Sequence, residues 1–212
     1  IRLVRAAVPD EIAVIGFAGA QVTLLAYLVE GGGSRDFMGL RSALRRDPAA
    51  ARAALDALAR AMRGYLGIQV AAGADVVQLF DTWAGVLGVA EFGSIAVPAA
   101  RAALSGLEIP RIYFAPGAGH ALEAQLAVGA EGYGIDWRTP LAHAWTRLGD
   151  VAIQGNLDPA VLLTDPATIR TEVAAMLDSV AGRSGLVVNL GHGIDRNTPP
   201  EHVAALVEAV RS

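Results

Sequence analysis

The sequence contains no cysteine, and its 17 Lys and Arg residues are all arginine. Without cysteine, the protein has no disulfides, no thiolate zinc site and no thiol nucleophile. Without lysine, Schiff-base chemistry, covalently bound pyridoxal phosphate and a Walker-type phosphate loop are excluded. Any chemistry must therefore use arginine, carboxylates, histidine, tyrosine, hydroxyl groups and backbone dipoles.

Charged residues are also few, at 18% against 53% hydrophobic, so a large core can form. The net charge of −4 gives no reason to expect nucleic acid or an anionic membrane as a partner. The longest apolar run, Val14–Val29, is shorter than the roughly 20 residues that a membrane-spanning helix needs, and Gln21 and Thr23 interrupt it. The run is therefore not a membrane span, and the glycines behind it can form either a functional loop after a buried element or a linker between two modules.

Six short apolar runs predict β-strands: Ala13–Phe17, Val76–Phe80, Arg111–Phe114, Gly132–Asp136, Val151–Gln154 and Leu186–Leu190. Their continuous apolar character is typical of parallel strands that are buried on both faces. A helical pattern follows each strand, which indicates a parallel α/β fold. We predict one domain over residues 1–212, a (β/α)8 TIM barrel with only about six βα units present. A doubly wound open sheet is the structural alternative.

Three helices are marked clearly in the sequence. Pro48–Gly64 carries an apolar face, with Asp56 and Arg60 expected to form an i,i+4 ion pair on the opposite face. Asp165 precedes a proline and is expected to cap the next helix. Thr198 is expected to begin a capping box for the last helix.

The predicted strands run into glycines or small polar residues, and in a parallel barrel these ends open on one face, where active sites lie. At these ends His192, Asp81 and Thr82 fit a site role and a structural role equally well. Three Asx residues are more consistent with turns: Asp136, Asn156 and Asp158.

The remaining polar candidates favour structural roles. Three histidines lie in or beside predicted helices and are expected to be solvated or capping: His120, His143 and His202. Tyr27 sits in an apolar run, where core packing is the default. The glycine groups lack a full G-x-G-x-x-G pattern, although the last two strand ends would suit a phosphate. No acidic or histidine cluster has metal-ligand spacing, so we predict no metal site.

Five segments resemble the uroporphyrinogen decarboxylase family: "GFAGAQVTLLAYLVEGGGS", "GADVVQLFDTWAG", "GIDW", "QGNLDP" and "NLGHGIDRNTPPEHV". The resemblance extends over essentially all 212 residues. It implies a cytoplasmic, homodimeric (β/α)8 barrel that needs no cofactor. The implied enzyme is a carboxy-lyase of heme biosynthesis that removes CO2 from the four acetate side chains of uroporphyrinogen III, giving coproporphyrinogen III.

The resemblance also implies four substrate-binding residues. Phe17 corresponds to the phenylalanine that packs against the macrocycle, and Tyr27 to the tyrosine of the same segment. Thr82 is the hydroxyl residue of the LFDSWAG-type motif, and His192 is the histidine of NLGHG. Each is expected to contact substrate carboxylates or the tetrapyrrole face. Gln21-Val22 stands where the family usually has proline and an aromatic residue, which alters that cavity wall.

The family's amino-terminal part has no counterpart here. By resemblance it carries two βα units, an arginine-rich loop that binds carboxylates and the aspartate held under the pyrrole N–H groups, so we assign no catalytic residue. Because Ile1 is not a translation start, we expect a longer parent chain, with a truncated inactive homologue as the alternative. Residues 1–212 alone are expected to be inactive and to leave the first and last strands with unpaired edges.

Two other functions stay open. A corrinoid-linked methyltransferase shares this barrel but uses zinc held partly by cysteine thiolate, which the chain lacks. A non-catalytic tetrapyrrole-binding homologue would fit the absence of the arginine-rich loop and of the aspartate. The sequence upstream of Ile1 would distinguish this homologue from the enzyme.

Overall fold

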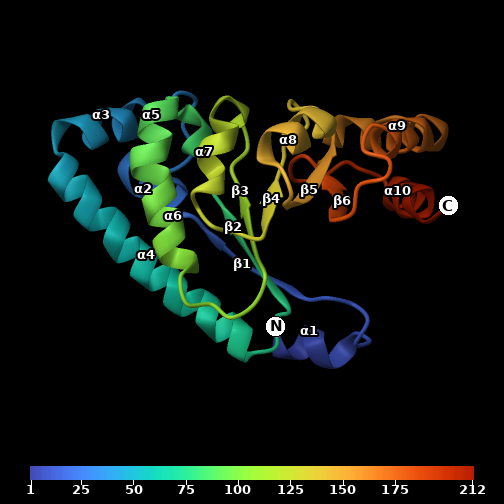
Figure 1. Cartoon of the computed structure of the whole chain (residues 1–212), viewed down its shortest axis with the longest axis horizontal. Coiled ribbons are helices and arrows are strands. Elements are labelled where there is room, and N and C mark those ends of the chain that lie inside the picture. Colours follow the sequence, from blue (N-terminus) through green and yellow to red (C-terminus); the bar gives the residue numbers. More distant parts are fainter. The chain divides into compact units, whose positions relative to one another are not determined.

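The computed structural model describes residues 1–212, which divide into two compact units, Ile1–Gly132 and Tyr133–Ser212. The first unit holds three parallel strands in chain order: β1 (Ile15–Gly19), β2 (Val76–Phe80) and β3 (Arg111–Phe114). β4 (Gly132–Gly134) begins at the boundary. The second unit continues with β5 (Ala152–Leu157) and β6 (Leu186–Leu190), which pair in parallel. Helices separate successive strands, so the predicted α/β arrangement is confirmed (Figure 1).

The predicted strand bounds are correct for β2, β3 and β6 and shifted for the others. β1 begins at Ile15 because its register with β2 starts at the pair Ile15 and Val76, which leaves Ala13 outside the ladder. β5 runs on to Leu157, because its pairing with β6 continues through Gly155 and Asn156. The glycine and asparagine that suggested a loop are therefore part of a strand.

Helices precede and follow the strands of the first unit in the chain, and most of them lie to one side of the strands (Figure 1). They are α1 (Arg2–Ala7), α2 (Gln21–Glu30), α3 (Met38–Arg46), α4 (Pro48–Ala71), α5 (Val89–Glu91), α6 (Val97–Leu104) and α7 (Leu122–Leu126). Short one-turn helices cover Ala84–Val86, Phe92–Ala96 and Gly119–Ala121. α4 and α6 pack side by side, and α4 also packs on β1.

Helix α4 differs from its prediction in length and in its ion pair. It continues past Gly64 to Ala71, although Gly64 and Gly67 each cost roughly 1 kcal/mol within a helix, because Leu66 is fully buried. Asp56 pairs with Arg52 at 3.1 Å and not with Arg60, so the predicted ion pair is wrong. Both spacings are i,i+4, and sequence spacing alone does not choose between them.

The helices of the second unit are α8 (Leu141–Leu148), α9 (Pro166–Asp178) and α10 (Pro200–Arg211), with a one-turn helix at Pro159–Leu163. α9 and α10 lie side by side (Figure 1) and share a core with the end of β5. The buried members of that core are Leu157, Leu162, Ile169, Val173 and Ala205.

One of the two predicted caps in this unit is confirmed. Asp165 accepts hydrogen bonds from the N–H groups of Ala167 and Thr168, and the hydrogen bond from the Thr168 hydroxyl lowers the pKa of Asp165. The capping box at Thr198 is wrong, because α10 begins at Pro200 and Pro199 takes the cap position. Thr198 lies one residue too early to reach the first turn, and its buried hydroxyl has no hydrogen-bond partner.

The apolar run near the amino terminus forms β1 and α2. No helix in the structure is long and apolar enough to cross a bilayer. Helix α2 ends at Glu30 and is capped by Gly31, whose φ of 73° is the left-handed conformation that favours glycine at this position. The loop that follows leads to Phe37, which is buried at the start of α3.

The edge of β1 that faces away from β2 is occupied by a side chain. The Gln69 amide accepts a hydrogen bond from the Phe17 N–H at 2.9 Å and donates one to the Phe17 carbonyl at 2.8 Å. Gly16 leaves room for this amide, since a Cβ there would lie 2.9 Å from the Gln69 oxygen. The expectation of an unpaired edge is therefore wrong at Phe17, where an amide takes the place of a neighbouring strand.

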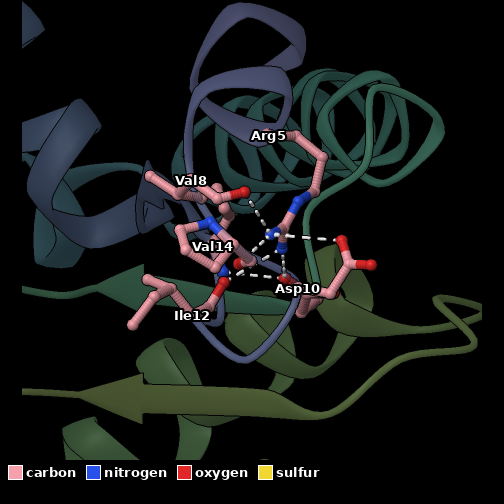
Figure 2. A network of polar contacts seen from close by, with 7 residues as sticks. Arg5, Val8, Asp10, Ile12 and Val14 are labelled. Carbon is pink, nitrogen blue, oxygen red and sulfur yellow. Dashed lines mark hydrogen bonds and ion pairs between the residues drawn. The ribbon is translucent and has the colours of Figure 1, made fainter.

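A single arginine holds the segment between α1 and β1 (Figure 2). The Arg5 guanidinium lies 3.0 Å from the carboxylate of Asp75, which also accepts the Val14 N–H at 2.7 Å. The same guanidinium donates hydrogen bonds to three backbone carbonyl groups of the turn, those of Val8, Pro9 and Ile12. The chain therefore enters β1 in a fixed position relative to the start of β2.

We predict that Arg5→Ala lowers the free energy of unfolding by about 1 to 2 kcal/mol, because the turn loses its shared donor while part of the site stays hydrated. Amide hydrogen exchange at residues 8–14 should become faster. Arg2→Ala, at an exposed position of the same helix, is the control. Equal stability and exchange in the two variants would show that the network does not hold the turn.

Candidate functional site

A buried carboxylate lies at the end of β2. Asp81 is 1% exposed and accepts hydrogen bonds from the Tyr113 hydroxyl at 2.9 Å, the Thr23 N–H at 3.1 Å and the Thr23 hydroxyl at 3.0 Å. The Thr23 oxygen in turn accepts the Trp83 N–H at 3.1 Å. Asp81 therefore joins three successive βα units, through α2, its own strand end and β3.

Burial raises the pKa of Asp81 from 3.8 to about 6, although the hydrogen bonds from Tyr113 and Thr23 oppose the shift. Burial and the neighbouring carboxylate raise the pKa of Tyr113 well above 10. The sequence left Asp81 between a site role and a structural role. Its side chain is closed off from solvent, so it cannot bind a ligand directly.

Three of the four predicted site residues lie in the first unit. Tyr27 on α2 is 42% exposed and meets the Trp83 ring edge-on at 6.3 Å between ring centroids. Phe17 on β1 is 61% exposed and contacts Phe80 in the same manner at 6.0 Å. Thr82, between Asp81 and Trp83, is half-buried. Core packing, the default interpretation for Tyr27, is therefore wrong.

The fourth predicted residue, His192, lies in the second unit after β6. It lines an open hollow of about 320 Å³ together with Trp137, Asp158 and Asp195. The rings of Trp137 and His192 meet edge-on at 5.9 Å, and the Arg138 guanidinium stacks 3.7 Å from the centre of the Trp137 ring. The hollow thus combines an aromatic wall with titratable groups.

The two glycines around His192 have different roles. A Cβ on Gly191 would lie 2.3 Å from the backbone nitrogen of Trp137, whereas a Cβ on Gly193 would meet nothing within 4 Å. The chain after β6 therefore passes close to the backbone after β4, and only glycine permits this approach. This packing places His192 beside Trp137.

Two of the three Asx predictions are confirmed. Asp136 accepts the Arg138 N–H and Asp158 accepts the Ala160 N–H, each at 2.9 Å, so both build local turns. The interpretation of Asn156 as a turn residue is wrong. Its side-chain amide donates to the carbonyl groups of Asp136 at 2.8 Å and Thr139 at 2.6 Å, which ties β5 to the loop after β4.

The other histidines have contacts consistent with structural roles. Nε2 of His120 lies 2.8 Å from the Leu87 carbonyl oxygen, and Nδ1 of His202 lies 2.9 Å from that of Leu162. His143 is exposed on α8, near Arg147. No group of three or more His, Asp or Glu side chains is arranged to hold a metal ion.

Two residues of these surroundings were not predicted from the sequence. Trp137 stands in the quoted "GIDW" segment, but nothing local indicates that its ring meets His192. Tyr113 falls in the middle of a predicted buried strand, where a tyrosine needs a partner for its hydroxyl. That requirement was the available signal, and the acidic residue at the end of the preceding strand was the candidate partner.

The profile of the family Uroporphyrinogen decarboxylase (URO-D) matches residues 1–212. The chain belongs to this family. It is 43% identical over 218 aligned residues to the uroporphyrinogen decarboxylase of Chromohalobacter salexigens and 41% identical over 213 to that of Citrifermentans bemidjiense. Each alignment covers 99% of this chain, and 62% and 63% of the two relatives. The chain thus spans about three-fifths of the length of these relatives.

Solved structures agree with the fold. A methyltransferase from Methanosarcina mazei superposes with a TM-score of 0.84 over 98% of this chain and 61% of its own, at 22% identity. A B12-independent methionine synthase from Shewanella superposes with a TM-score of 0.70 at 10% identity. Such likeness shows the fold alone, and it confirms the TIM-barrel class over the doubly wound alternative.

The raised pKa of Asp81 predicts how stability depends on pH. The native state binds this proton more tightly than the unfolded chain, so the contribution of Asp81 to stability falls as pH rises from about 4 to about 6. Between pH 5 and pH 7 the free energy of unfolding should fall by about 1 kcal/mol more in the parent than in Asp81→Asn. Urea unfolding at both pH values measures this difference. Asp150→Asn, at an exposed position, should show the same change in the free energy of unfolding as the parent. The same change in Asp81→Asn as in the parent would contradict the prediction.

The glycines around His192 provide a matched pair of variants. Gly191→Ala should lose about 1 to 3 kcal/mol of stability, since its methyl group would collide with the backbone at Trp137. Gly193→Ala should change stability by less than about 0.5 kcal/mol, as at other open surface positions. Thermal unfolding of both variants is the measurement. Similar losses in the two would show that the close approach at Gly191 is not required.

Proposed function

We propose that the protein is a uroporphyrinogen decarboxylase, which converts uroporphyrinogen III to coproporphyrinogen III by removing CO2 from four acetate side chains. The observation that carries this proposal is the similarity to relatives of that name, at 41 to 43% identity over 99% of this chain. The exposed aromatic rings and hydroxyl groups of the first unit support a flat, carboxylate-bearing substrate.

The proposed roles of the site residues follow from their chemistry. Phe17 presents an exposed ring to a tetrapyrrole face, and the hydroxyl groups of Tyr27 and Thr82 donate hydrogen bonds to substrate carboxylates. His192 donates from its ring nitrogen in the hollow of the second unit. None of these four side chains makes a hydrogen bond or ion pair within the protein, whereas His120 and His202 each contact a backbone carbonyl group.

The decarboxylation itself needs a proton and an electron sink. A proton adds to a pyrrole carbon, the cation that forms accepts the electron pair of the acetate carbon–carboxyl bond, and CO2 leaves behind an exocyclic methylene. The methylene then takes up a proton and the ring carbon loses the one it had gained, which restores the pyrrole and leaves a methyl group. A fixed negative charge near that cation stabilises the transition state. The arginine-rich loop and the aspartate that the resemblance implies have no counterpart in residues 1–212, so we assign substrate binding and no catalytic residue to this sequence.

We further propose, on the same resemblance, that both units belong to one barrel domain of a cytoplasmic homodimer. The proposed reaction uses no cofactor or metal, and the proposed partner is the small-molecule substrate without nucleic acid or membrane. A methyltransferase function has weaker support, because that likeness rests on a solved structure at 22% identity and the chain has no cysteine for a thiolate zinc site. Stoichiometric zinc in the purified protein would favour the methyltransferase.

The direct test incubates the full-length protein without oxygen with uroporphyrinogen III and follows the porphyrins formed after oxidation. We expect coproporphyrinogen through intermediates with seven, six and five carboxylates. A folded full-length protein that binds the substrate but forms no product would identify the non-catalytic homologue instead.

His192→Ala and Tyr27→Phe should each lower kcat/KM by roughly 10- to 100-fold, the loss of one hydrogen bond to a charged group. Circular dichroism should stay native, because neither side chain lies in the core. His143→Ala is the matched control, at an exposed histidine away from strand ends. Full activity in His192→Ala or Tyr27→Phe would remove that residue from the proposed site.

A further inference from the structure

Helix α2 carries Tyr27 but has no cap of its own. Its N-cap residue is Ala20, which has no polar side chain, and its first turn has no acidic residue. Helix N-termini are stabilised by an oxygen that accepts the first free N–H groups and by nearby negative charge. Asp81, which lies 58 residues later, accepts the N–H of Thr23 in that first turn. A carboxylate from the next βα unit thus replaces the missing cap.

Capping by Asp81 fixes the direction of Tyr27. Thr23 and Tyr27 are four residues apart and lie on the same face of α2, one turn from each other. The first turn is held twice, because both the N–H and the hydroxyl of Thr23 donate to the same carboxylate oxygen. A change in the position of Thr23 would therefore rotate or shift the turn that carries Tyr27.

The same threonine also fixes the loop that carries Thr82. Its hydroxyl oxygen accepts the Trp83 N–H, and Thr82 lies between Trp83 and Asp81, both of which are held. The Trp83 ring then packs edge-on against Tyr27 and lies 4.7 Å from the ring of Phe37. Two connections from Thr23, one along α2 and one through Trp83, thus meet at Tyr27.

The second oxygen of Asp81 is held independently. It accepts the hydroxyl of Tyr113, which comes from β3 and is fully buried. This bond fixes the rotamer of the carboxylate, so that its other oxygen faces α2. Asp81 itself is closed off from solvent and cannot reach a substrate.

We propose that Asp81 and Thr23 form a positioning pair that sets the orientation of Tyr27 and Thr82 toward the substrate. The Asp81 carboxylate fixes Thr23, and the Thr23 hydroxyl transmits that position to Trp83 and Tyr27. The consequence for turnover rests on the proposed function. The consequence for the position of Trp83 rests on the contacts alone.

The test replaces the Thr23 hydroxyl in the full-length protein. Thr23→Val keeps the shape of the side chain and the backbone N–H bond to Asp81, but removes the hydroxyl's hydrogen bonds to Asp81 and Trp83. We expect kcat/KM to fall roughly 10-fold or more, mainly through KM. Thr23→Ser restores the hydroxyl and should recover kcat/KM to within about three-fold of the parent. Thr23→Ala serves in place of Thr23→Val if the latter does not fold. Leu55→Val, a core change on the buried face of α4, controls for loss of stability.

A second measurement does not depend on turnover. In protein labelled with 5-fluorotryptophan, the fluorine resonance of Trp83, assigned by its absence in Trp83→Phe, should move in Thr23→Val. It should stay near its parent position in Thr23→Ser and Leu55→Val. If the parent forms no coproporphyrinogen but the resonance moves as expected, the proposed function fails and the positioning pair stands.

Two results would overturn the proposal. An unchanged Trp83 resonance in Thr23→Val would show that the hydroxyl does not hold the tryptophan. A loss of kcat/KM in Leu55→Val as large as that in Thr23→Val, at equal loss of stability, would show a general structural effect and no positioning.

Discussion

A carboxylate taken out of water needs hydrogen-bond donors, and Asp81 finds three of them in two other βα units. A buried charge without such partners would cost several kcal/mol, so β3 and the first turn of α2 must lie where their donors reach it. The parallel pairing holds β1, β2 and β3 side by side. The carboxylate then fixes the position of α2, which follows β1, and of the loop that follows β2. The orientation of Tyr27 and Trp83 depends on that single side chain.

The second unit positions its candidate site residue by a different physical means. His192 is placed by close backbone packing, since Gly191 lies against the backbone of Trp137 with no space for a Cβ. The first unit thus uses a buried polar network and the second uses the absence of a side chain. Both devices act at strand ends, where the parallel arrangement gathers residues that are far apart in the sequence.

The sequence predicted the helices and strands better than the hydrogen-bond and packing partners of individual side chains. Strands β2, β3 and β6 were predicted with their observed bounds, because apolar continuity is a local property of each strand. The cap at Asp165 was predicted for the same reason, since the N–H groups that donate to its carboxylate lie two and three residues away. The predicted capping box at Thr198 was wrong because α10 begins one residue later, at the second of two prolines. The predicted end of α4 was wrong because the helix continues to bury Leu66.

In the candidate site, too, local features were predicted from the sequence and contacts between distant residues were not. Phe17, Tyr27, Thr82 and His192 were predicted through family motifs. The role of Asp81, in contrast, depends on Tyr113 and Thr23, which lie 32 residues after it and 58 residues before it. No spacing rule relates residues that far apart, because only the register of the parallel strands brings them together. A single sequence therefore predicts the polar residue at a strand end but not the donors that bury it.

The most direct measurement of the Asp81 anchor is a carbon-detected NMR titration of its side-chain carboxyl group in the folded protein. Burial among Tyr113 and Thr23 predicts a midpoint near the value of about 6 that the surroundings impose. The pH-dependent resonance should be missing in Asp81→Asn, because an amide does not titrate, and this absence assigns the resonance to Asp81. A midpoint near the ordinary value of 3.8 would contradict the account, because it would show that burial does not raise the pKa of this carboxyl group.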